Sequence, residues 1–110
     1  MLPAKPPFVI HVSEMADFLF PLYIGRENGR KRLKRSKWHN PFKITPDTDR
    51  ADALDLFRLH MTVGEGRHLD LDELTGKPLA CWCRRSDTPR TDDNMCHGDV
   101  LVWLSKERFA

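Results

Sequence analysis

The chain has 110 residues, of which 40% are hydrophobic and 31% are charged. This length suits one compact domain and excludes a conventional two-domain protein. The net charge of +2 conceals a basic segment, residues 26–43, which holds eight Lys or Arg residues against one Glu and so carries +7, whereas the remainder carries −5. No apolar stretch approaches the roughly 20 residues of a membrane-spanning helix, and the N-terminus lacks the apolar core of a secretory signal, so we expect a soluble, cytoplasmic protein without a membrane partner.

The first half of the chain predicts two short strands and a long loop. Residues 1–7 are rich in proline, and we expect them to form a flexible leader. Residues 8–12 and 22–24 are short apolar runs typical of strands. Turn and proline signals over residues 25–48 predict a long loop, within which residues 27–37 form a basic loop. Long loops in compact domains are often functional.

The second half predicts a helix followed by a central strand. Asp49 can cap a helix in which Leu54, Phe57 and Met61 have the spacing of a buried face. Residues 78–82 form a short apolar run after a turn, and we interpret them as the central strand.

A last helix is expected over residues 96–108, with Asp99 near the positive end of its dipole. Val100, Trp103 and Leu104 are expected on one face of that helix. The order strand, strand, helix, strand, helix predicts an α/β fold: a small layered domain with a short central sheet, flanking helices and long functional loops. We expect residues 1–110 to form a single domain.

Three cysteines and a histidine give the sharpest chemical signal. Cys81 and Cys83 straddle the end of the predicted central strand, and Cys96 and His97 stand at the predicted start of the last helix. Zinc takes thiolate and imidazole ligands, so these four residues are the candidate metal ligands and Zn is the candidate cofactor. His97 follows Cys96 directly, which makes it either the fourth ligand or an orienting group. An iron–sulfur cluster, a reactive thiol at Cys96 and inert packing are the alternatives.

The candidate ligand-binding residues are Arg26, Trp38 and Asn40. Arg26 offers a fork for phosphate, Asn40 offers donors and acceptors, and Trp38 can stack on a base or anchor the loop to the core. Ligands of α/β sheets collect beyond the carboxyl ends of the strands, so we expect these residues to share one concave surface with the cysteines and His97.

The basic loop supplies candidate nucleic-acid contacts, which would make binding depend strongly on salt. A solvated loop that only favours solubility is the alternative. The contact residues are Arg30, Lys31, Arg32, Lys34, Arg35 and Lys37.

Four blocks of the sequence resemble a known family. They are Tyr-Ile-Gly-Arg at residues 23–26, Ser-Lys-Trp-His-Asn-Pro-Phe at 36–42, Leu-Ala-Cys-Trp-Cys at 79–83 and Cys-His-Gly-Asp at 96–99. In this order they resemble the domain of unknown function family numbered 4326, which occurs in bacteria and their phages. His39 stands where the family usually has Gly, and residues 27–35 and 84–95 form longer intervals than is typical. The resemblance assigns no reaction, but it implies a shared site for Arg26, Trp38, Asn40, Cys81, Cys83, Cys96, His97 and Asp99.

The leading hypothesis is a small metal-supported α/β module that binds a nucleotide or nucleic-acid ligand. An alternative is an enzyme acting on a nucleoside, nucleotide or base, with Cys96, His97 and Asp99 as the candidate catalytic residues. A zinc deaminase is excluded, because its His-x-Glu and Cys-x-x-Cys blocks are absent. A third hypothesis is a phage-type interaction module that engages a host protein in the host cytoplasm through the basic loop.

Overall fold

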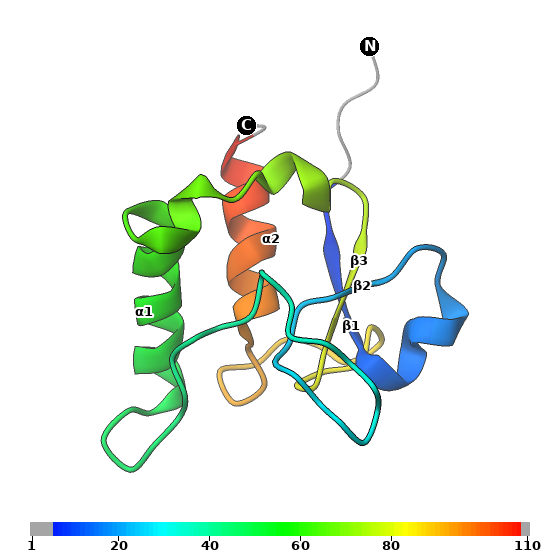
Figure 1. Ribbon diagram of the computed structural model, residues 1–110, viewed down its shortest axis with the longest axis horizontal. Helices are drawn as coiled ribbons and strands as arrows, with labels where there is room; N and C mark the ends of the chain where they lie inside the picture. Colours follow the sequence, from blue (N-terminus) through cyan, green and yellow to red (C-terminus); the bar gives the residue numbers. More distant parts are fainter. Residues whose placement is uncertain (1–5, 109–110) are drawn as a thin grey trace.

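The computed structural model describes residues 6–108 (Figure 1). The expected leader falls mostly outside this range, since residues 1–5 are not described. Its last residue, Pro7, is fully buried. The backbone N–H of Phe8 donates to the carbonyl oxygen of Lys77 at 3.2 Å. The chain therefore belongs to the folded core from Pro7 onward.

A three-stranded parallel sheet lies at the centre, in the order β1-β3-β2. Strand β1 spans Phe8–His11, β2 spans Leu22–Tyr23 and β3 spans Pro78–Cys81. All four residues of β3 are buried, as is typical of a central parallel strand that is covered on both faces. The structure thus confirms the predicted α/β class, with the predicted central strand in the middle of the sheet.

The parallel arrangement brings the carboxyl ends of the three strands to one edge. His11 is paired with Cys81, and Tyr23 is paired with Ala80. Figure 1 shows the cyan and orange loops gathered at this same end of the molecule. Residues that follow β2 and β3 in the sequence therefore become neighbours of the segment that leads into the last helix.

Two helices complete the layers, with α2 lying between α1 and the sheet (Figure 1). Helix α1 spans Arg50–Thr62 and α2 spans His97–Arg108. The carboxylate of Asp49 caps α1 by accepting the N–H of Asp52 at 2.9 Å, as the sequence predicts. Short 3₁₀ helices η1, η2 and η3 span Val12–Asp17, Glu65–His68 and Leu71–Leu74. Within residues 6–108, no helix combines the length and apolarity needed to cross a bilayer.

The buried face of α2 differs from the prediction at one position. Leu101 and Leu104 are buried in the core with Phe57 of α1. Trp103 is 39% exposed, and the Arg58 guanidinium lies 4.5 Å from its ring centroid. Since an α-helix turns about 100° per residue, Trp103 stands roughly 200° around the helix from Leu101 and cannot share its face.

The long loop is present as expected. Between β2 and α1, the only ladder contacts in the described structure are isolated bridges that join Asn28 to Leu33 and Thr45 to Thr48. The loop returns along the carboxyl edge of the sheet before it enters α1 (Figure 1).

Candidate metal centre and adjoining cavity

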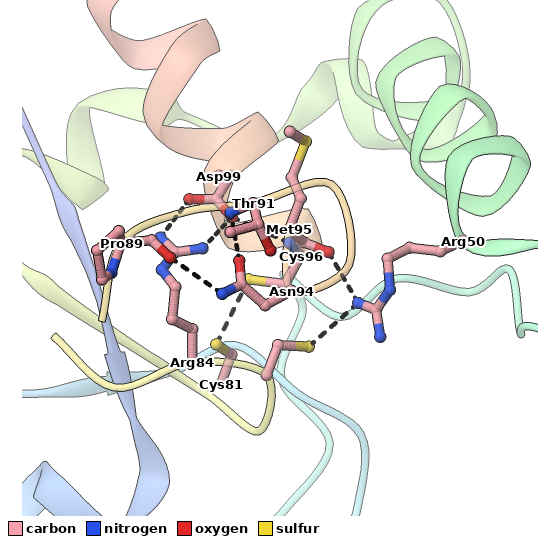
Figure 2. Close-up of polar contacts among 10 residues, drawn as sticks. Arg50, Cys81, Arg84, Pro89, Thr91, Asn94, Met95, Cys96 and Asp99 are labelled. Carbon is pink, nitrogen blue, oxygen red and sulfur yellow. Dashed lines mark hydrogen bonds and ion pairs between the residues drawn. The ribbon is translucent and has the colours of Figure 1, made fainter. Parts of the chain in front are cut away.

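Three cysteine sulfurs lie together at the carboxyl edge of the sheet. Cys81 ends β3, Cys83 follows it, and Cys96 immediately precedes α2. Their Sγ atoms all lie within 4.8 Å of one another, and those of Cys81 and Cys96 are 3.4 Å apart (Figure 2). Thiolates that bind one tetrahedral zinc ion at about 2.3 Å stand roughly 3.8 Å from each other. The three free thiols could therefore hold a metal ion with only small adjustments.

A buried ion pair fixes the position of Cys96. The Asp99 carboxylate accepts the backbone N–H of Cys96 at 2.9 Å. Both Nη atoms of Arg84 donate hydrogen bonds to the same carboxylate, at 2.6 and 2.7 Å (Figure 2). The side chains of Arg84 and Asp99 are 9% and 8% exposed, and their hydrogen bonds raise the pKa of Arg84. The Asp99 carboxylate thus joins Arg84, the residue after Cys83, to Cys96, the residue before α2.

Gly98 allows α2 to start close to the sheet. A Cβ atom at this position would stand 2.9 Å from Cδ1 of Ile24 and 3.1 Å from Cγ2 of Val9. It would also lie 3.3 Å from Sγ of Cys96. A side chain here would crowd the buried side chains of Ile24, Val9 and Cys96 and force them to shift, which gives a physical reason for the glycine in the block at residues 96–99.

Glu14 anchors the segment that follows Cys83. Its carboxylate accepts the Ser86 hydroxyl at 2.6 Å and the Ser86 N–H at 2.8 Å. It also accepts the N–H of His11 at 2.9 Å. These hydrogen bonds, that from the Ser86 hydroxyl first, together with the charge of Arg85, lower the pKa of Glu14 from 4.5 to about 2. The loop after Cys83 is therefore tied to η1 by an ionised carboxylate.

Glu14→Gln is expected to destabilise the fold in a pH-dependent manner. Because the folded-state pKa of Glu14 is depressed, its ionised form stabilises the protein above pH 4.5, and this contribution is lost as the pH falls toward about 2. Urea unfolding at a series of pH values should show the difference between wild type and variant shrinking across that range. Glu65→Gln, at an exposed position in η2, is the control. A difference that stays constant below pH 4.5 would contradict this role.

Arg50 connects α1 to the cysteines. Its Nη1 atom donates to the carbonyl oxygen of Met95 at 2.8 Å (Figure 2). The same atom lies 3.8 Å from Sγ of Cys83. Hydrogen bonds from Cys81 and Cys96, followed by the contact with Arg50, lower the pKa of Cys83. Interactions with its two neighbours and burial raise the pKa of Cys96. Among the three thiols, the exposed one at Cys83 is therefore the first to become a thiolate.

His97 lies at the same edge but does not point its Nε2 atom at the sulfurs. That atom is 2.6 Å from the carbonyl oxygen of Ile24. Burial lowers the pKa of His97, so the ring is neutral at pH 7 and Nε2–H donates to this carbonyl. Within the described residues, the potential metal-binding group contains the three cysteines and not His97. The orienting role that the sequence left open for His97 stays a prediction.

A cavity of about 550 Å³ adjoins the cysteines. Cys81, Cys83, Cys96 and His97 all contribute to its wall. The charged part of the lining has three cations and one carboxylate, which are Arg26, Lys43, Arg50 and Glu27. The aromatic part comprises Tyr23, Phe42 and Trp82. The cavity therefore combines soft metal donors, an excess of positive charge and flat rings.

Two of the three predicted ligand-binding residues line the cavity, and the third is buried in the core. Arg26 and Asn40 line the cavity, and Nε and Nη2 of Arg26 donate to the carbonyl oxygen of Asn40 at 3.2 and 2.9 Å. The side chain of Asn40 binds the backbone of Ala53 and Phe42, so it holds the loop against α1. Trp38 is only 1% exposed and belongs to the core. The expectation that Trp38 shares the concave surface is therefore corrected, since its ring serves as the anchor that was the alternative.

The cations of the basic loop lie outside the cavity lining, which the loop reaches only with Glu27 and Asn28 at its start. All six of its predicted nucleic-acid contacts are exposed. Lys37 differs from the others because it forms an ion pair with Glu73 at 2.5 Å. The nucleic-acid role of Arg30, Lys31, Arg32, Lys34, Arg35 and Lys37 stays a prediction.

The three candidate catalytic residues are close in sequence but have separate partners. The Cys96 thiol faces Cys81, the Nε2 atom of His97 binds Ile24, and Asp99 is paired with Arg84. These contacts do not link the three side chains into a proton relay. A catalytic role for them stays a prediction, and the observed contacts of Asp99 are with Arg84 and the backbone N–H of Cys96.

Several site residues were missed by sequence reasoning. Tyr23 and Trp82 stand inside the blocks that carry the family resemblance, and that position was an available signal. Arg84 follows such a block directly. The sequence around Arg50 does not indicate a role in the site, because Arg50 is an ordinary first residue of a helix. Its contact with Cys83 depends on how α1 packs in the folded chain.

Comparison with known proteins places these features in a family. The family described as "Domain of unknown function (DUF4326)" matches residues 11–107. "Uncharacterized protein R718" of Acanthamoeba polyphaga mimivirus is 32% identical over 87 residues, which cover 77% of this chain and 66% of that protein. The chain thus matches slightly less than two thirds of the length of this relative. No solved structure matches the chain. Because the family match covers nearly all of the sequence, the chain belongs to the domain of unknown function family DUF4326.

Proposed function

We propose that this chain is a small zinc-supported α/β module that binds a nucleotide or nucleic-acid ligand in the cavity beside its cysteines. One observation carries the proposal. Three thiols, three cationic side chains and three aromatic rings all line the same cavity.

The donor set supports zinc as the metal. Cys81, Cys83 and Cys96 offer three soft thiolates, and such ligands favour Zn²⁺ over hard cations such as Mg²⁺ or Ca²⁺. An ion at this point would tie the end of β3 to the start of α2. It would thereby stabilise the loop over residues 84–95, which contains no helix or strand in the structure.

The remaining lining supports an anionic ligand with a planar ring. The contact with Asn40 fixes the guanidinium of Arg26 at the cavity wall, where it can meet a phosphate. The Nε1 atom of Trp82 donates to the Tyr23 hydroxyl at 3.0 Å, which orients an indole that is 42% exposed. Stacking on such a ring contributes about 1 to 3 kcal/mol per base.

The basic loop extends this surface beyond the cavity. Its exposed cations would contact the phosphates of a longer strand and would add affinity independent of sequence. A mononucleotide would fill the cavity alone, whereas an oligonucleotide would use the cavity and the loop.

Charge reversal at the cavity tests the proposal. Fluorescence anisotropy with labelled mononucleotides and a short single-stranded oligonucleotide would measure binding at several salt concentrations. Lys43→Glu is expected to weaken mononucleotide binding roughly tenfold, because it replaces attraction to phosphate by repulsion. Lys106→Glu makes the same change of charge on α2, outside the cavity lining, and is the matched control.

A loop variant separates the two parts of the surface. Replacing Arg30, Lys31, Arg32, Lys34 and Arg35 by Ser should flatten the salt dependence of oligonucleotide binding and leave mononucleotide binding nearly unchanged. The proposal fails if the wild-type protein binds neither probe, or if Lys43→Glu and Lys106→Glu weaken mononucleotide binding equally.

A further inference from the structure

We infer that a metal ion held by Cys81, Cys83 and Cys96 keeps its fourth coordination position open to the cavity, and that an aromatic nitrogen of an anionic ligand fills that position. This inference rests on the metal site and the cavity of the proposed function. In the proposed function the ion stabilises the fold, whereas in this inference it also binds the ligand directly.

The first step concerns the number of protein donors. Zinc is commonly four-coordinate, with four protein ligands in closed structural sites and three in sites that bind water or substrate. Among the His, Cys, Asp and Glu side chains of residues 6–108, the group around the sulfurs supplies three donor atoms. The structure therefore matches the open type of site.

The second step concerns His97, the nearest candidate for a fourth ligand. Its Nε2–H is committed to the carbonyl oxygen of Ile24 at 2.6 Å. Its ring also packs edge-on against Phe57, with 5.2 Å between centroids. To ligate through Nε2, the ring would have to leave the buried carbonyl of Ile24 without its hydrogen-bond donor, which is energetically unfavourable. Neither ring nitrogen of His97 belongs to the group of donor atoms that lie within 4.8 Å of one another, so His97 is part of the wall and not a ligand.

The third step concerns the direction of the open position. Cys81 and Cys96 are each 2% exposed, so the protein closes around two of the sulfurs. Cys83 is exposed, and all three cysteines border the cavity. An ion on these sulfurs consequently has protein on its Cys81 and Cys96 side and the cavity on its free side.

The last step concerns the ligand. Three thiolates outweigh the charge of a divalent ion by one, which makes the centre electron-rich and suits a soft or nitrogen donor better than a hard oxygen. Arg50 lies beside Cys83 and offsets that excess charge. Of the other charged residues in the lining, Arg26 and Lys43 outnumber Glu27, so the cavity favours a ligand that also carries an anionic group.

Cobalt substitution tests the inference with defined probes. Co²⁺ takes the place of Zn²⁺ in such sites, and its visible absorption bands report the ligand set. Imidazole-4-acetate and histamine carry the same ring with opposite charges on the side chain. We expect imidazole-4-acetate to shift the bands of the cobalt protein, and to reach half-saturation at a roughly tenfold lower concentration than histamine.

Variants distinguish the open site from a closed one. His97→Gln, whose amide can still donate to Ile24, should leave the cobalt bands of the ligand-free protein unchanged. The inference would be overturned if neither probe shifted the absorption bands of the wild-type cobalt protein. It would also be overturned if His97→Gln changed those bands in the way expected for loss of a nitrogen ligand, because His97 would then occupy the fourth position. An equal response to both probes would overturn the choice of an anionic ligand.

Failure of the proposed function would look different. If the protein bound neither cobalt nor zinc, the metal centre would be wrong, and with it both the proposed function and this inference. A protein that binds mononucleotides and holds cobalt in a site closed to both probes would retain the proposed function and overturn only the open position.

Discussion

Protein purified without chelator is expected to contain about one zinc ion per chain and to unfold at a much lower temperature once a chelator removes that ion. The proposed ion would bind the folded chain, in which the Sγ atoms of Cys81, Cys83 and Cys96 lie within 4.8 Å of one another. At a free zinc concentration a thousandfold above Kd, this linkage stabilises the fold by about 4 kcal/mol. For a domain of this size, each kcal/mol corresponds to roughly 4 °C or more, so the unfolding temperature should fall by about 16 °C or more.

A single substitution separates the effect of the metal from that of packing. Cys83→Ser removes a ligand at an exposed position, so it should lower the metal content without creating a cavity in the core. The chelated variant and the chelated wild type should then unfold at similar temperatures, whereas the two proteins should differ in the presence of zinc. Three freely titratable thiols in protein that was never exposed to chelator would refute the metal centre.

The edge of the sheet was the part of the site that the sequence could predict. Short apolar runs bounded by turn residues indicate strands, and parallel strands end at a common edge. For that reason Arg26, which follows β2, and Cys81, which ends β3, could be expected to meet, and both line the cavity. The order of the elements thus fixed the neighbourhood of the cysteines.

The partners of individual polar side chains could not be predicted in the same way. His97 and Asp99 are neighbours in sequence, yet they bind Ile24 and Arg84, and these contacts depend on the packing of α2 against the sheet. Buried polar groups must find partners, but local sequence does not say which ones. The exposure of Trp38 was predicted wrongly for a related reason. The cations near it in the sequence suggest an exposed side chain, but its ring packs in the core.

Arg84→Met is expected to destabilise the protein by about 3 to 5 kcal/mol, because it leaves the buried carboxylate of Asp99 without its partner. Chemical unfolding of the chelated protein measures this loss without a contribution from the ion. Lys37→Met is the matched control, since it breaks an ion pair with Glu73 whose side chains are 52% and 44% exposed. Exposed pairs contribute about 1 kcal/mol or less, so this variant should remain close to wild type.

The double variant Arg84→Met/Asp99→Leu distinguishes the stability of the fold from the geometry of the metal centre. With no orphaned charge, it should recover most of the stability that Arg84→Met loses. In the double variant, however, the N–H of Cys96 has lost the acceptor that Asp99 provides at 2.9 Å in the wild-type protein. Zinc affinity, measured by competition with a chromophoric chelator, should therefore stay at least about tenfold below that of wild type, as is typical when a group that positions a metal ligand is removed. If affinity instead returned together with stability, Asp99 would act on the metal only through the overall fold, and its role in positioning Cys96 would be wrong.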